Sequence, residues 1–82
     1  MEPDFDVVLY TMQGPPHVHN VLQYFRYAHL PPALQERSRP FAALAAQVAS
    51  GPVNPETVVA LRKLLEAKDA AVRAHFFIPA GA

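Results

Sequence analysis

The sequence contains no cysteine, which excludes both disulfide bonds and thiolate metal sites. Its 82 residues make a single domain, and a domain of this size buries only about 60–65% of its unfolded surface. Small chains without disulfides usually gain stability from a bound metal or from oligomerisation. Hydrophobic residues make up 51% of the chain and charged residues only 17%. We therefore expect a homo-oligomer in which other copies cover part of the apolar surface.

The chain also lacks net charge, with seven basic and seven acidic residues. Domains that bind nucleic-acid polymers are usually basic, so we expect no such partner, whereas a small ligand with two or three phosphates needs only a few cations. No apolar run is long enough to cross a bilayer. The acidic start MEPDFD is unlike a basic secretory signal, so we expect no membrane partner and a cytosolic protein.

Residues for catalysis are missing as well. The sequence offers no arrangement of nucleophile, base and orienting group, and its three glycines do not form a phosphate-binding loop. His17 and His19 are two residues apart, without the acidic neighbours or the spacing of a familiar metal site. We therefore expect a protein that is not an enzyme and that uses neither a cofactor nor a metal.

We expect one mainly α-helical domain in three parts: residues 1–16 as an N-terminal arm, 17–50 as short helices and 54–76 as one long helix. The segment Asp6–Met12 (DVVLYTM) is β-branched and aromatic, which predicts a short strand or extended arm. The segment His17–Tyr27 (HVHNVLQYFRY) carries one apolar stripe with helical spacing.

Prolines and caps set the expected helix ends. Inside a helix Pro40 would lose a hydrogen bond and clash with the preceding turn, so we expect a break there, with Ser38 as the N-cap of a new short helix. Asn54 and Pro55 are typical of the cap and first position of the long helix. Two helices joined by a short loop pack antiparallel, which predicts a helical hairpin.

The long helix has a narrow apolar seam that one residue breaks, because the pattern requires an apolar side chain where the sequence has Lys68. Either the Lys68 stem lies along the hairpin with its amine in water, or the amine points into a cleft between subunits and binds an anion. The remaining seam residues are Val58, Leu61, Leu65 and Val72. Two i,i+4 ion pairs are expected on the outer face, Arg62–Glu66 and Asp69–Arg73.

Aromatic and cationic residues concentrate in QYFRYAHLPPALQERSRPF, residues Gln23–Phe41. Phe25 and Phe41 fall on apolar faces, which favours core packing. The other rings can stack on nucleobases, and arginine binds phosphate in a bidentate manner. The predicted ligand-binding residues, which include the lysine of the seam, are Tyr24, Arg26, Tyr27, His29, Arg37, Arg39 and Lys68.

The segments FRYAHLPP, SRPFAALAAQV and ALRKLLEAKDAAVRA, with the Pro/Asn restart between the last two, form a layout that resembles a family of small bacteriophage proteins. These are the helical-hairpin sponges that block CBASS and Thoeris defence, and the likeness covers about Leu22 to Ala74. It implies a helical homo-oligomer that sequesters cyclic di- or trinucleotide signals, uncut, in the host bacterial cytoplasm. It also implies roles for Tyr27 and for a hairpin lysine, Lys63 or Lys68.

A function of another class stays open on the sequence. The apolar seam of a helical hairpin also suits a protein–protein interaction module that inhibits or scaffolds a host or virion protein. Such a module needs no small ligand. Because the chain has three tyrosines and no tryptophan, a bound nucleobase would stand out in its absorbance near 260 nm.

Overall fold

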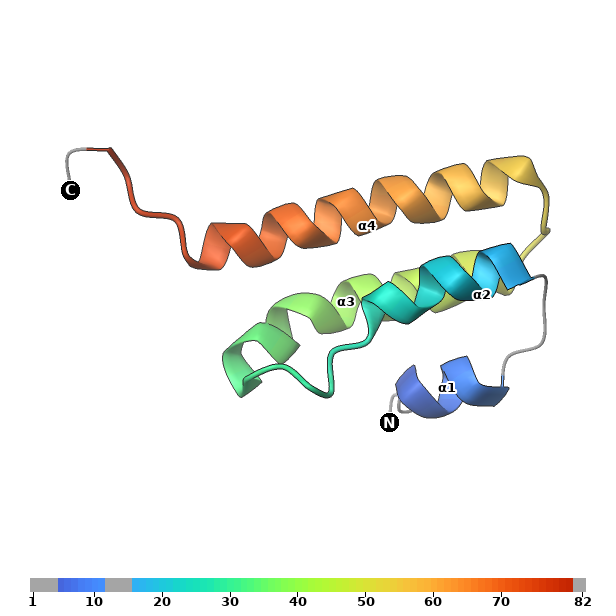
Figure 1. Cartoon of the computed structure of the whole chain (residues 1–82), viewed down its shortest axis with the longest axis horizontal. Helices are drawn as coiled ribbons and strands as arrows, with labels where there is room; N and C mark the ends of the chain where they lie inside the picture. The colour runs from blue at the N-terminus through green and yellow to red at the C-terminus, as the bar shows by residue number, and fades with distance from the viewer. Residues whose placement is uncertain (1–4, 12–15, 81–82) are drawn as a thin grey trace.

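The computed structural model describes residues 5–11 and 16–80, which are mainly helical and contain no strand. Four α-helices and one 3-10 turn follow in order: α1 (Phe5–Thr11), α2 (Pro16–Leu22), η1 (Gln23–Phe25), α3 (Pro32–Ala49) and α4 (Pro55–His75). The two long helices, α3 and α4, lie side by side and run in opposite directions, while α2 and η1 pack across both (Figure 1).

The N-terminal segment predicted as a strand or extended arm is the helix α1. A strand would place Phe5, Val7 and Leu9 on one face, whereas Phe5 and Leu9 are buried and Val7 is 59% exposed. A helix brings Phe5 and Leu9 together with i,i+4 spacing and satisfies its backbone internally, without a partner strand. The remainder of the predicted arm, residues 1–4 and 12–15, lies outside the described residues.

The predicted break at Ser38–Pro40 is also wrong, because α3 continues through Pro40 for 18 residues. One face of α3 stays buried on both sides of the proline, with Ser38 before it and Ala42 and Ala45 after it. Pro40 itself lies on the exposed side. Burial of the inner face therefore outweighs the backbone hydrogen bond that the proline removes. Within residues 17–50, α2 and η1 are short as predicted, whereas residues 32–49 form one longer helix.

The predicted long helix is confirmed as α4, which begins at a capping box. The Asn54 side chain accepts a hydrogen bond from the Glu56 amide at 2.9 Å, and Thr57 Oγ1 accepts one from the Asn54 amide at 3.1 Å. Pro55 takes the first helical position, where its missing amide hydrogen costs nothing.

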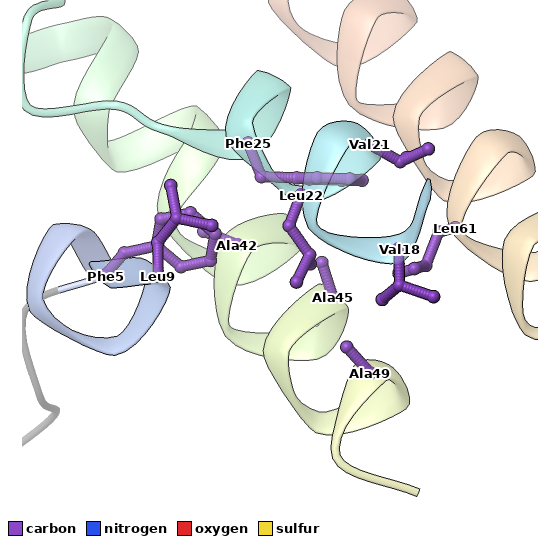
Figure 2. Packing of buried hydrophobic residues seen from close by; sticks show 10 residues of the cluster. All are labelled: Phe5, Leu9, Val18, Val21, Leu22, Phe25, Ala42, Ala45, Ala49 and Leu61. Atoms are coloured by element: carbon purple, nitrogen blue, oxygen red, sulfur yellow. The ribbon is translucent and has the colours of Figure 1, made fainter. Parts of the chain in front are cut away.

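The core lies where α1, α2 and η1 cover α3 and α4. Figure 2 shows Phe5 and Leu9 of α1 beside Ala42 of α3. Leu22 and Phe25 are each 1% exposed, and burial on this scale stabilises the fold by roughly 1.5–3 kcal/mol per side chain. The other buried hydrophobic residues are Val18, Val21, Ala45, Ala49 and Leu61. Core packing is thus confirmed for Phe25, and the half-buried Phe41 packs against the same cluster.

No helix within residues 5–11 and 16–80 combines the length and the hydropathy that crossing a bilayer requires.

Candidate functional site

Four of the seven predicted ligand-binding residues line one hollow: Tyr24, Arg26, His29 and Lys68. The volume of the hollow is about 360 Å³, near the lower end of the range for small-molecule sites, roughly 300–1,000 Å³. The other lining residues are Gln23, Leu30, Ser38, Asp69, Val72 and Arg73.

Three parts of the fold build this hollow. The turn η1 supplies Tyr24, and the connection to α3, residues 26–31, supplies Arg26 and His29. That connection follows a sharp change of backbone, because Arg26 is extended (φ −62°, ψ 139°) immediately after η1. The floor includes Ser38 of α3, and α4 contributes residues with helical spacing from Lys68 onward.

The positive charges of the hollow outnumber the negative ones, with Arg26, Lys68 and Arg73 against the single carboxylate of Asp69. The Lys68 side chain is only 15% exposed, and its Nζ lies 2.9 Å from Asp69 Oδ1. Nε of Arg26 donates to Asp6 Oδ1 at 3.2 Å. The excess of cations makes the hollow suited to an anion.

Arg73 has neither an ion pair nor a side-chain hydrogen bond within the described part of the chain. The predicted pair Asp69–Arg73 is therefore wrong, because Asp69 pairs with Lys68 instead. The predicted pair Arg62–Glu66 is replaced in the same way by Lys63–Glu66, with 3.8 Å between nitrogen and oxygen. Arg73 thus lines the hollow as a cation that a ligand can bind without displacing a carboxylate.

Ser38 is the unexpected member of the site. The Ser38 residue is 1% exposed, and the Ser38 Oγ has no hydrogen-bond partner among residues 5–11 and 16–80. A buried hydroxyl without a partner costs about 1–3 kcal/mol, so a hydrogen bond to a guest would remove a penalty that the protein already bears. Because the Oγ itself is not exposed, it would reach a polar ligand atom only after its side chain turns toward the hollow that the residue lines.

Tyr24 separates the first hollow from a second one. The second has a volume of about 290 Å³ and is also lined by Val21, Arg62, Leu65 and Glu66. Tyr24 is 60% exposed, and it is the residue that lines both hollows. A flat base could thus stack on its ring from either side, an interaction worth about 1–3 kcal/mol.

The other three predicted residues lie outside both hollows. The half-buried Tyr27 packs with its ring centroid 6.4 Å from that of Phe5. The guanidinium of Arg39 sits 5.7 Å from the Tyr27 centroid and donates to Glu36 at 2.8 Å. Tyr27 and then Glu36 raise the pKa of Arg39 above its ordinary value. Arg37 is exposed and lines neither hollow.

Sequence reasoning missed Ser38 and Arg73 as members of the site. The sequence around Pro40 predicts a helix cap at Ser38, and the i,i+4 spacing to Asp69 predicts a surface ion pair for Arg73. The helical spacing of α4 could have placed Arg73 on the same side of the helix as other residues of the site, because residues 62, 65, 66, 69, 72 and 73 form one stripe. All of them line one hollow or the other.

Histidines at the other end of the fold have different surroundings. His19 Nε2 lies 2.9 Å from the Leu9 carbonyl oxygen and so connects α2 to α1. His17 lies near the N-terminus of α4 instead, among apolar residues. In the ranges that the structure describes, no three His, Asp or Glu side chains gather closely enough to hold a metal ion.

No protein-family model, curated protein or solved structure matches this chain.

Proposed function

We propose that this protein is a bacteriophage sponge that binds cyclic di- or trinucleotide immune signals in the host bacterial cytoplasm and holds them without cleavage. By lowering the free concentration of the signal, it would block defence of the CBASS or Thoeris type. The observation that supports the proposal best is the hollow that Tyr24, Arg26, Lys68 and Arg73 line together with Ser38.

Each part of a cyclic nucleotide has a counterpart in this proposal. Tyr24 stacks on a base, and the stacking role that the sequence predicted for Tyr27 passes to Tyr24 because Tyr27 packs against Phe5. Arg73 and Lys68 bind a phosphate, the former as a cation without an ion pair in residues 5–11 and 16–80 and the latter as the partly buried charge beside Asp69. Ser38 hydrogen-bonds a polar atom of the base or ribose.

The size of the hollow favours a ligand shared between copies. About 360 Å³ suits part of a cyclic dinucleotide better than the whole. Such a ligand repeats one nucleotide unit around a two-fold axis, so two copies of the chain can each hold one half. The antiparallel pair of α3 and α4 then serves as the hairpin that presents the site, and the functional unit is a homo-oligomer.

Isothermal titration against a panel of cyclic di- and trinucleotides tests the proposal. We expect saturable heat with at least one member of the panel and recovery of intact nucleotide after the protein is denatured, as a non-enzymatic sponge requires. With protein and ligand at ~100 μM, absence of heat for every member would exclude affinities much tighter than millimolar and contradict the proposal. Absence of heat, together with a co-purified host protein, would favour an interaction module.

A further inference from the structure

The segment after α4 exposes three large apolar side chains in succession. Phe76, Phe77 and Ile78 are 63%, 74% and 76% exposed. Phe76 meets the ring of His75 edge-on at 5.1 Å between centroids, and the segment then leaves the helix. We call residues 76–78 the apolar tail. Burial of three such side chains against another apolar surface would be favourable in free energy.

An apolar hollow lies at the opposite end of α4. It has a volume of about 550 Å³ and is lined by His17, Val53, Asn54, Pro55 and Val58. We call it the distal groove. Val53 is 43% exposed although it is aliphatic, so the groove offers apolar surface that the described residues leave uncovered.

The tail of a chain cannot reach the groove of the same chain. The 21 residues of α4 separate them, about 30 Å at 1.5 Å per residue. Three extended residues span at most about 11 Å. Figure 1 shows the tail and the α3–α4 connection at opposite ends of the long axis of the molecule, which measures 47 Å. If the apolar tail occupies the groove, it must therefore be the tail of another molecule.

We propose that the occupant is the apolar tail of a second copy, in a two-fold dimer with the α4 helices antiparallel. Tail and groove lie at similar distances, about 15 Å, on either side of the middle of α4 near Glu66. A two-fold axis at that point brings each tail to the groove of the other copy, and both contacts close at once.

One exposed stripe of α4 allows the helices of two copies to approach closely. It consists of Val59, Lys63, Ala67, Ala70 and Ala74, and four of these five side chains are small or aliphatic. Helices that meet through small side chains approach closely, at interaxial distances near the lower end of ~8–10 Å. The low charge content of the whole chain, 17%, agrees with a surface of which part is covered.

This inference goes beyond the proposed function, because the residues of α4 through which the copies meet do not line the hollow, and it does not depend on the nucleotide. Dimer formation is therefore measured by sedimentation velocity on the full chain without ligand. We expect a dimer at micromolar concentration. Phe77→Asp and Val53→Asp should each weaken dimerisation on the order of 100-fold, because each change removes the same apolar contact twice.

Leu44→Asp is the matched control, since Leu44 is 46% exposed but lies on α3 and lines neither surface. It should leave the dimer unchanged. All three positions are exposed, so circular dichroism should show an intact fold in each variant. A monomeric wild-type chain, or a dimer that is insensitive to both tail and groove substitutions, would overturn the proposal.

The absence of cysteine permits a second test. Under mild oxidation the double variant Val53→Cys/Ile78→Cys should form a covalent dimer that stops at two copies. An open ladder of higher species would show that copies associate head to tail and would contradict the two-fold pairing. Nucleotide titration of the same proteins measures ligand binding separately. Loss of dimerisation and loss of ligand binding can therefore be distinguished.

Discussion

Replacement of Arg73 by glutamine is the sharpest perturbation of the proposed site. Arg73 lines the main hollow without an ion pair in the described residues. A unit charge about 4 Å from a phosphate contributes ~1 kcal/mol in water and ~4 kcal/mol at an effective dielectric constant of 20. Because Arg73 is exposed, we expect a value near the lower limit, about 1.5 kcal/mol, or roughly a tenfold rise in Kd.

The matched control is Arg37→Gln, which removes the same charge from an exposed position outside both hollows. Titration with a cyclic dinucleotide at low and high salt measures both variants. Kd should change little for Arg37→Gln, and the tenfold loss for Arg73→Gln should shrink as salt screens the charge. Neither variant should change the free energy of unfolding by more than about 0.5 kcal/mol. Equal loss of affinity in the two variants would refute the assignment of the hollow.

Three further substitutions test the fold and the floor of the site. Ser38→Ala should raise the free energy of unfolding by about 1 kcal/mol in urea denaturation, because it removes a buried hydroxyl that has no partner in the described residues. The same change should weaken ligand binding several-fold, and an unchanged affinity would show that Ser38 does not belong to the site. Pro40→Ala should raise the free energy of unfolding by about 1–3 kcal/mol, since it restores a helical hydrogen bond in α3. A lower free energy of unfolding would contradict a continuous α3 and support a helix break at Pro40. Asn54→Ala should lower the free energy of unfolding by about 1 kcal/mol through loss of the α4 cap. The control is Ser50→Ala, at an exposed serine that follows α3, and a smaller effect of Asn54→Ala than of this control would contradict the cap.

Local chemistry made parts of the fold predictable. The cap at Asn54 and the first-turn Pro55 are backbone signals that act within one turn, and α4 begins where they indicate. The seam of α4 was equally readable, because Leu61 is fully buried and Leu65 packs against the core.

Tertiary packing decided what local signals did not. The β-branched residues around Val7 favour a strand in isolation, but burial of Phe5 and Leu9 with i,i+4 spacing selects a helix. At Pro40 the local rule predicts a helix break, while the buried face that continues from Ser38 to Ala42 keeps α3 in one piece. Propensity is a weak prior wherever a segment can bury a continuous face.

The candidate site was partly predictable for a related reason. Tyr24, Arg26 and His29 are close in sequence, so their proximity follows from the turn itself. Lys68 was visible as a break in the apolar seam, and it is indeed the least exposed of the ion-paired cations. Arg73 joins them through the packing of α4 against η1, and the only hint of this in the sequence is its place on the helical stripe of α4 described above.

The most direct measurement of the central claim is an amide NMR titration of the full chain with the cyclic nucleotide that binds best. Amide signals of residues 23–30 and 68–73 should shift together and saturate with one binding curve, because both segments line the same hollow. Amide signals of Arg37 and Arg39, which do not line the hollow, should stay near their free positions. Saturable shifts centred on these two residues, with residues 68–73 unaffected, would contradict the proposed site.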